Sequence, residues 1–269
     1  MGKIVFASDF HLGQKGLTTS EERERSVIRW MEDIAGDADE VFLLGDVFDF
    51  WYEYRSVIPK GFTRFLGALS RLADTGKPVH LFTGNHDMWI FDYFTKEFGI
   101  PVYRKPEVFE RHGKKLIIGH GDGLGPGDYT YKFIKKIFNN PLCIHLFHWL
   151  HPSIGMAIAN RWSTSSREGH DDIYTFLGPD KEFLLQYCEA ESGLDDSIDY
   201  FVFGHRHLPV DYLLKNKKTR YINTGDWLAF QSYATMEDGQ MSVRFYDRQS
   251  FTVVDNDPAS WNNKLSAVH

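Results

Sequence analysis

The chain has 269 residues, of which 42% are hydrophobic and 25% are charged. This composition excludes a disordered or fibrous protein and suits one large domain or a domain with an insertion. The net charge of −7 argues against a protein that binds nucleic acid through overall positive charge. Two cysteines, Cys143 and Cys188, are too few for a disulfide framework or a thiolate zinc site. The N-terminal MGKIVFASDF lacks the apolar core of a signal peptide, so we expect a cytoplasmic protein.

The first third of the chain alternates short apolar runs with amphipathic patterns. The apolar runs predict strands over Lys3–Ala7, Glu40–Leu44 and Val79–Thr83. Helical spacing of apolar residues predicts helices between them, over Ser20–Ala35 and Phe62–Asp74. This strand–helix–strand order predicts a parallel sheet buried between helices.

The later strands are joined by short polar turns, which predicts antiparallel hairpins in addition to the parallel part. These expected strands are Val108–Arg111, Lys115–Ile118, Tyr200–Phe203, Val210–Lys215, Arg220–Asn223, Tyr233–Glu237 and Met241–Tyr246. The fold class is therefore α/β with a mixed sheet arrangement.

One segment interrupts this pattern. Between Tyr129 and Arg167 there is no Asp or Glu, and this stretch carries a charge of +5 while the rest of the chain carries −12. Within it, Pro141–Ala159 contains no charged residue of the Lys, Arg, Asp or Glu types. We predict a helical cap over residues 125–170, inserted into a core formed by residues 1–124 and 171–269. The apolar surface of this cap either receives a substrate or packs on the core, and the sequence leaves both interpretations open.

Five short blocks rich in Asp, Asn and His follow apolar runs. They are Asp9-Phe10-His11, Gly45-Asp46-Val47-Phe48-Asp49, Gly84-Asn85-His86-Asp87, Gly119-His120-Gly121 and Gly204-His205-Arg206-His207. Because the carboxyl ends of parallel strands meet at one edge of a sheet, we expect the blocks to converge there. A glycine before a ligand allows a sharp backbone turn and leaves room for a metal ion.

The residue types in these blocks are those that bind Mn²⁺, Fe or Zn²⁺. Seven candidates are present: Asp9, His11, Asp46, Asn85, His120, His205 and His207. Seven ligands are too many for one ion, whereas two ions about 3.5–4 Å apart that share a carboxylate would use all of them. Asp46 is the natural bridge. Such a pair neutralises an anionic phosphate ester and lowers the pKa of a bound water from about 15.7 towards ~7.

In this order, the five blocks resemble those of the calcineurin-like metallophosphoesterase superfamily. The resemblance implies a four-layer αββα sandwich and a hydrolase with two divalent ions, Mn²⁺ first and Fe or Zn²⁺ as alternatives. It implies one ion on Asp9, His11, Asp46 and His207, and a second ion on Asp46, Asn85, His120 and His205. It also implies two catalytic residues, with His86 contacting the phosphoryl oxygen or leaving group and Asp49 orienting the His86 ring.

Within the superfamily, the chain is most similar to the UDP-2,3-diacylglucosamine pyrophosphatases of the lipid A pathway, in length and in the position of the cap. This resemblance implies hydrolysis of a lipid-linked nucleotide to UMP and 2,3-diacylglucosamine 1-phosphate. It also implies a peripheral enzyme on the inner membrane that meets the membrane surface through its cap, with no nucleic acid and no obligate protein partner. The implied substrate-binding residues are Asn85, Asp128, Tyr131, Lys132, Asn160, Arg161, Ser165 and Arg167.

Alternatives remain at the level of the substrate. The chain has His86 and Asp49 where the best-known members of that branch carry Arg and Glu, so its local pattern matches the general phosphoesterase. This leaves open a phosphatase or nucleotide phosphodiesterase that acts on a different, soluble phosphoester. A nuclease is disfavoured by the acidic remainder of the chain, and a non-catalytic scaffold has no need of seven converging ligands.

Overall fold

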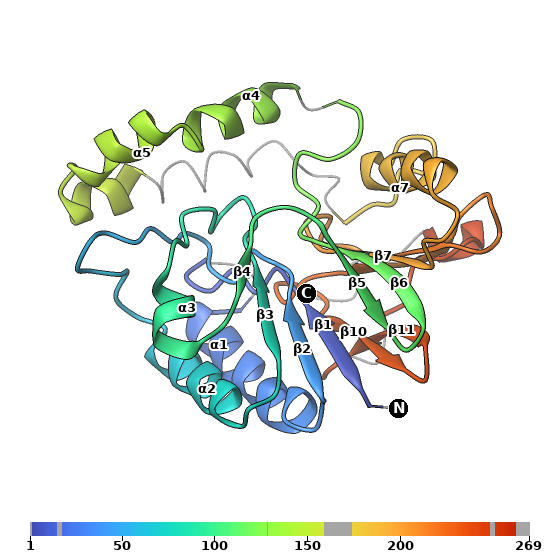
Figure 1. Cartoon of the computed structure of the whole chain (residues 1–269), viewed down its shortest axis with the longest axis horizontal. Coiled ribbons are helices and arrows are strands. Elements are labelled where there is room, and N and C mark those ends of the chain that lie inside the picture. Colours follow the sequence, from blue (N-terminus) through green and yellow to red (C-terminus); the bar gives the residue numbers. More distant parts are fainter. Residues whose placement is uncertain (1, 15–17, 128, 159–173, 248–250, 262–269) are drawn as a thin grey trace.

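The computed structural model describes residues 2–14, 18–127, 129–158, 174–247 and 251–261, and two β-sheets form its centre (Figure 1). The first sheet has the order β11-β10-β1-β2-β3-β4. Its strands are β1 (Ile4–Ala7), β2 (Glu40–Leu43), β3 (Val79–Phe82), β4 (Val102–Tyr103), β10 (Ser232–Glu237) and β11 (Gln240–Phe245). Strands β1 to β4 are parallel, with Ile4 opposite Glu40 and Val41 opposite Val79, whereas β10 runs antiparallel to β1.

The second sheet has the order β5-β6-β7-β9-β8. Its strands are β5 (Glu107–Arg111), β6 (Lys114–Ile118), β7 (Tyr200–Phe203), β8 (Pro209–Leu213) and β9 (Arg220–Thr224). The central strands β6, β7 and β9 are parallel, and β5 and β8 pair antiparallel at the two edges. The predicted combination of parallel and antiparallel pairing is confirmed, and it is divided between two sheets.

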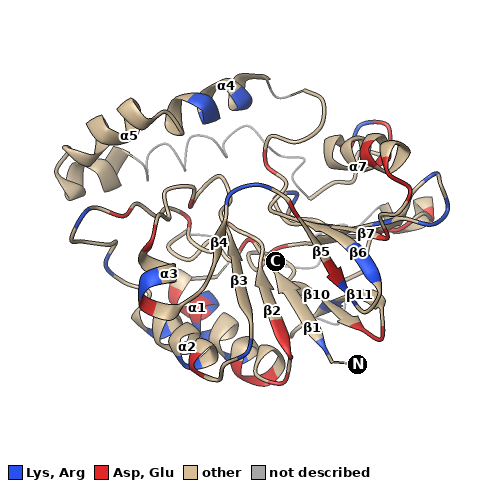
Figure 2. Cartoon of the chain, viewed as in Figure 1, with Lys and Arg blue, Asp and Glu red and all other residues tan. Residues whose placement is uncertain are grey.

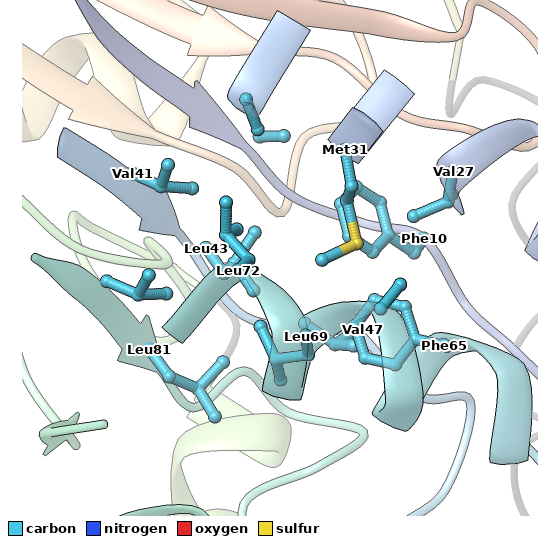
Figure 3. Packing of buried hydrophobic residues seen from close by; sticks show 14 of the residues in the cluster. Phe10, Val27, Met31, Val41, Leu43, Val47, Phe65, Leu69, Leu72 and Leu81 are labelled. Atoms are coloured by element: carbon cyan, nitrogen blue, oxygen red, sulfur yellow. The ribbon is translucent and has the colours of Figure 1, made fainter. Parts of the chain in front are cut away.

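Helices cover the outer face of the first sheet. They are α1 (Ser20–Trp30), which continues into a π-helical turn (Met31–Ala35), α2 (Thr63–Asp74) and α3 (Tyr93–Phe98). Thr19 caps α1 together with Glu22, because each side chain accepts a backbone hydrogen bond from the other residue. Figure 3 shows the core beneath these helices, where Val27, Met31, Phe65, Leu69 and Leu72 meet Val41, Leu43 and Leu81 of the sheet. Neither α3 nor β4 was predicted from the sequence.

The two sheets pack face to face, and a further helix covers the second one. Phe6 and Phe42 of the first sheet share a buried cluster with Ile118 and Val202 of the second. Helix α7 (Phe183–Leu194), also not predicted, places Leu184, Leu185 and Cys188 against the outer face of the second sheet. The four-layer αββα fold is therefore confirmed. The expectation of a parallel sheet between two helical layers is wrong, because a second sheet covers one face of the first. A continuous apolar strand does not specify whether a helix or a sheet covers each of its faces.

The cap segment contains α4 (Tyr129–Phe138), α5 (Pro141–His148) and a helical stretch over residues 152–158, and α4 and α5 lie apart from the two sheets (Figure 1). One apolar side of this segment packs on the core, in a cluster of Phe138, Ile144, Phe147 and Met156 with Phe50, Tyr52, Met88 and Trp89. Its other side exposes Leu142, Leu146, Trp149 and Ile154. Packing on the core therefore applies to one side of the cap, and the reception of a substrate stays a prediction for the exposed side. The division at residues 125 and 170 stays a prediction. None of the helices among the described residues is both long and apolar enough to cross a membrane.

Glu40 joins the two sheets, and this contact predicts how stability depends on pH. Its carboxylate accepts hydrogen bonds from Arg111 Nε and Nη2 at 2.6 and 2.7 Å, and lies 2.9 Å from His80 Nε2. Burial alone raises the pKa of Glu40, but Arg111 and His80 outweigh it and lower the pKa from 4.5 to about 2. The stabilisation is therefore present above pH 4.5 and is lost as the pH falls towards 2.

We expect Glu40→Gln to lower the free energy of unfolding by about 2 kcal/mol at pH 7, because a charge-assisted hydrogen-bond pair is lost. The difference from the wild type should shrink between pH 4.5 and pH 3, measured by urea denaturation. Glu107→Gln is the control, since the one ion pair of Glu107 among the described residues is a 3.7 Å surface contact with Lys105. An equal loss at pH 7 and pH 3 would contradict the electrostatic cause.

Candidate metal centre

The predicted ligands follow the carboxyl ends of β1, β2, β3, β6 and β7, and the structure brings them together. Ten non-glycine residues of the described part of the chain have a positive φ, and five of them are predicted ligands: Asp9, His11, Asp46, His205 and His207. A left-handed backbone is uncommon outside glycine, although Asp and His adopt it more readily than most residues, and such conformations cluster at functional sites.

Glycines in the blocks leave the space that the ligands occupy. A Cβ atom on Gly84 would collide with Asp46 Oδ1, and one on Gly204 would collide with Ser8 Oγ and approach Asp9 Oδ2 to 2.6 Å. Backbone therefore passes directly beside two ligand carboxylates. These two glycines therefore leave room for the ligand carboxylates, and the room for a metal ion stays a prediction.

Asp9, His11 and His207 form one cluster. His11 Nε2 lies 3.7 Å and His207 Nε2 lies 3.5 Å from Asp9 Oδ1. Asp9 Oδ2 accepts hydrogen bonds from the His205 backbone N–H at 3.0 Å and from the Ser8 hydroxyl. The other oxygen, Oδ1, is buried and has no hydrogen-bond partner among the described residues, and the same is true of His11 Nε2. Two unsatisfied ligand atoms that face each other fit a cation between them.

Asp46 lies between this cluster and a second one. Its Oδ2 atom is 3.7 Å from His11 Nε2 on one side and 3.3 Å from His120 Nε2 on the other. Its Oδ1 atom accepts the His86 backbone N–H at 2.8 Å, which fixes the orientation of the carboxylate. The position between two histidines is the one that a bridging carboxylate requires.

The second cluster contains Asp46, His120 and His205. His120 Nδ1 donates a hydrogen bond to the Leu44 carbonyl at 2.7 Å, so Nε2 keeps the lone pair that a metal ion needs. Asn85 Oδ1 lies 3.2 Å from the same Nε2 atom. All seven predicted ligands therefore lie within two adjoining groups.

The electrostatics at one histidine of each group, His11 and His120, favour positive charge. Burial lowers the pKa of His11, but contacts with Asp49 and Asp9 outweigh it and raise the pKa to about 10. For His120, burial is likewise outweighed by the charge of Asp46, and its pKa is also raised to about 10. The buried carboxylates therefore favour bound positive charge, which either protons or metal ions can supply. Together with the unsatisfied ligand atoms, this shows that the residues fit divalent ions.

His86 lies at the edge of the two groups. Its Nδ1 atom is 3.0 Å from the Asp49 carbonyl oxygen and 3.6 Å from Asp49 Oδ1, and Asp49 Oδ1 is also 3.5 Å from His11 Nδ1. Asp49 is thus placed to orient two rings, of which the sequence analysis considered only His86. A carbonyl can only accept, so Nδ1 carries the proton in this contact. Burial lowers the pKa of His86, which favours its neutral form.

Two further acids support the site: Asp87 is expected from the sequence to be structural, and for the loop that contains Asp226 the sequence leaves a place near the site and a plain turn equally open. Asp87 accepts backbone hydrogen bonds from Gly84 at 2.7 Å and from Val47 at 2.8 Å, so it joins two ligand-bearing loops. Asp226 Oδ2 lies 3.1 Å from His207 Nδ1, while its Oδ1 accepts the backbone N–H groups of Ala229 and Phe230. Asp226 therefore fixes the ring of a candidate ligand. Its position in a loop directly after β9 was the only available signal.

We expect Asp226→Asn to weaken metal binding by about 10- to 100-fold, which is the typical effect of losing such a supporting carboxylate. The amide can donate to His207 Nδ1 and so place the proton on Nε2, the atom that faces Asp9. Titration with Mn²⁺ under calorimetry measures the change. Asp74→Asn, an exposed site at the end of α2, is the control. Unchanged affinity in Asp226→Asn would show that Asp226 has no positioning role.

The predicted substrate residues are only partly described. Asp128, Asn160, Arg161, Ser165 and Arg167 lie outside the described residues. Tyr131 donates its hydroxyl to Asp122 Oδ2 at 2.5 Å, and Lys132 Nζ donates to the Gly125 carbonyl at 2.5 Å. Both side chains therefore attach α4 to the loop that follows His120.

A four-layer α/β sandwich with adjoining His/Asp clusters at its strand ends defines a metal-dependent hydrolase of the kind that acts on phosphate esters. The chain belongs to the calcineurin-like phosphoesterase family, whose model matches residues 2–209. Members of this family use divalent metal ions, in agreement with the clusters.

Curated relatives match most of the chain. It is 36% identical over 247 residues to the UDP-2,3-diacylglucosamine hydrolase of Porphyromonas gingivalis. The matched region covers 87% of this chain and 94% of that protein. It is 26% identical to the protein of the same name from Pseudomonas fluorescens, over 83% of this chain and 87% of that protein. Among solved structures, Yfce, a phosphoesterase from E. coli, is similar with a TM-score of 0.46 and 17% identity, over 92% of this chain and 95% of that chain.

Proposed function

We propose that the protein hydrolyses UDP-2,3-diacylglucosamine to UMP and 2,3-diacylglucosamine 1-phosphate. The observation that carries this proposal is the 36% identity to a UDP-2,3-diacylglucosamine hydrolase over 94% of that protein's length. The site agrees with a diphosphate substrate, because its two adjoining groups of ligands suit a pair of ions. Water adds to one phosphorus atom, the bond from that phosphorus to the bridging oxygen breaks, and two phosphate monoesters leave.

We assign one ion to Asp9, His11, Asp46 and His207 and a second to Asp46, Asn85, His120 and His205, with Mn²⁺ as the first candidate. When bound, such ions neutralise the diphosphate and acidify the attacking water. Metal-free protein reloaded separately with Mn²⁺, Fe²⁺ or Zn²⁺ tests this assignment by metal content and turnover. Two ions per chain support the assignment, and one ion per chain would contradict it.

The chain's own residues supply the remaining functions. Asp46 and Asp9 hold the negative charge at the centre of the site, and Asp226 and the Leu44 carbonyl orient His207 and His120. His86 presents Nε2 towards the reacting phosphate and, once protonated there, donates to a phosphoryl oxygen or to the leaving oxygen. The charge of the bound diphosphate favours that protonation, against the effect of burial.

Release of UMP from the lipid substrate tests the proposed function. Wild-type protein with Mn²⁺ and UDP-2,3-diacylglucosamine in detergent should release UMP, detected by chromatography. Faster turnover of simple soluble phosphoesters, with no UMP release, would refute the lipid substrate and favour a general phosphatase or nucleotide phosphodiesterase instead.

The substrate is a lipid, so we place the exposed side of the cap at the membrane surface. Leu142, Leu146, Trp149 and Ile154 are exposed there, in a stretch with no Lys, Arg, Asp or Glu. Co-sedimentation with anionic liposomes should fall in Leu146→Ser/Trp149→Ser. Val108→Ser/Leu194→Ser removes two exposed apolar residues elsewhere and is the control. Equal sedimentation of both variants would place the contact outside the cap.

A further inference from the structure

A pocket of about 620 Å³ opens beside the candidate metal centre, between α4 and the connection from β4 to β5. His120, a candidate ligand, forms part of its wall together with Gly121 and Asp122. The opposite wall is α4, and Arg104, Lys105 and Pro106 of the β4–β5 connection complete it. A group bound at the metal centre would therefore extend directly into this pocket. Its volume is in the range of sites that hold a small organic ligand.

The pocket is strongly cationic although the chain as a whole is acidic. Its wall contains Arg104, Lys105, Lys132, Lys135 and Lys136, and Asp122 is the only acid among the described residues that line it. Lys135 Nζ lies 2.5 Å from Asp122 Oδ2, so that acid is already neutralised. The surplus positive charge favours a ligand that carries phosphate.

Two of these cations are available to a ligand. Lys136 is exposed and makes no side-chain hydrogen bond or ion pair with the described residues. The side chain of Lys105 is 79% exposed, and among the described residues its one ion-pair partner is Glu107 at 3.7 Å. By contrast, Arg104 is held by the carbonyls of Met88 and Ile90, at 3.1 and 2.5 Å. Lys105 and Lys136 therefore face the pocket from opposite walls without strong partners.

Aromatic surface lies beside these charges. Tyr129 and Phe133 are one helical turn apart on α4, line the same pocket, and are 78% and 65% exposed. Exposed aromatic rings next to a phosphate-binding charge suit a nucleobase, since base stacking on an aromatic side chain contributes about 1–3 kcal/mol.

The cap divides into two chemically different halves. Figure 2 shows Lys and Arg on α4 and on the connection after β4, whereas α5 has none. An acyl chain prefers the uncharged half over Pro141–Ala159, and a charged nucleotide prefers the half that contains α4. The two ends of a lipid-linked nucleotide are thereby assigned to different parts of the cap.

We infer that this pocket binds the nucleoside monophosphate portion of the substrate, with its phosphate near His120, Lys105 and Lys136 and its base against Tyr129 or Phe133. This inference rests on the proposed function and adds the orientation of the substrate to it. The nucleotide lies on the α4 side of the metal centre, and the acylated sugar lies on the other side.

Calorimetric titration with UMP tests the inference on Mn²⁺-loaded protein. The Kd of UMP should rise about tenfold or more in Lys105→Ala/Lys136→Ala, because two charge-assisted contacts are lost. Lys215→Ala removes an exposed lysine between β8 and β9 and should leave the Kd unchanged. Metal content and thermal midpoint, measured on each variant, show that the fold and the metal centre are intact. A wild-type Kd in the double variant would overturn the assignment.

Phe133→Ala separates a nucleotide site from a site for phosphate alone. The Kd of UMP should rise while the Kd of inorganic phosphate stays the same. The nucleoside part of the inference is overturned if, in both Phe133→Ala and Tyr129→Ala, the Kd values of UMP and inorganic phosphate change equally or stay unchanged. Failure of the wild type to release UMP from UDP-2,3-diacylglucosamine, with this binding pattern intact, would remove the lipid substrate and leave the nucleotide pocket in place.

Discussion

Asp46→Asn is expected to lower kcat by ~10³-fold or more and to reduce the metal content below two ions per chain. Asp46 Oδ2 lies between His11 Nε2 and His120 Nε2, at 3.7 and 3.3 Å, so it is the only predicted ligand shared by both groups. An amide has no negative charge to share between two cations. Loss of the bridge therefore removes metal-ion stabilisation, which is worth several kcal/mol in the transition state.

Hydrolysis of bis(p-nitrophenyl) phosphate measures this loss independently of the lipid substrate. Asp37→Asn is the matched control, because Asp37 is exposed and precedes β2, whereas Asp46 follows the other end of that strand. Elemental analysis gives the metal content of both variants. Full activity and two ions per chain in Asp46→Asn would show that the site does not depend on a bridging carboxylate, and the two-ion assignment would then fail.

The ligand blocks could be found from the sequence because each one is short and follows a strand. An Asp-x-His or His-x-His motif in the loop directly after a parallel strand places its donors at the sheet edge. The structure accordingly brings Asp9, His11 and His207 together, although His207 lies almost 200 residues after the other two.

Supporting residues were harder to predict, because their role depends on contacts between loops. Asp226 acts through His207, and nothing in the local pattern around β9 shows that the two side chains meet. Asp49 was expected to orient His86, yet its carboxylate lies slightly closer to His11. Which histidine ring a carboxylate contacts depends on how the strand ends are staggered, and the periodicity of the sequence does not specify that stagger.

The prediction of the layers from the sequence was limited by a related ambiguity. The residues of β1, β2, β3 and β7 are all buried, so their sequences show no alternation that would distinguish the two faces. An apolar run of this kind is equally compatible with a helix or a second sheet as its neighbour. Only the resemblance to a known family implied the second sheet, and α7 was missed along with the layer it forms.

His86→Ala is expected to lower kcat by about 10²–10⁴-fold while both metal ions are retained. The His86 ring is held through Nδ1 by the Asp49 carbonyl, and its backbone N–H fixes Asp46, a contact that the substitution preserves. The side chain can therefore be removed without removing a metal ligand. His112→Asn is the control, since His112 lies in the β5–β6 turn with a φ of 52° that Asn tolerates.

His86→Gln distinguishes two ways in which this side chain can act. Glutamine can donate a hydrogen bond to a phosphoryl oxygen but cannot transfer a proton. Recovery of part of the lost kcat in His86→Gln would assign His86 to stabilising charge on phosphorus, whereas equal loss in the Gln and Ala variants would assign it to protonating the leaving oxygen. Because burial lowers the pKa of His86, the proton-transfer role also predicts that kcat falls as the pH rises, and that this pH dependence disappears in both variants. Wild-type kcat in His86→Ala would exclude both roles.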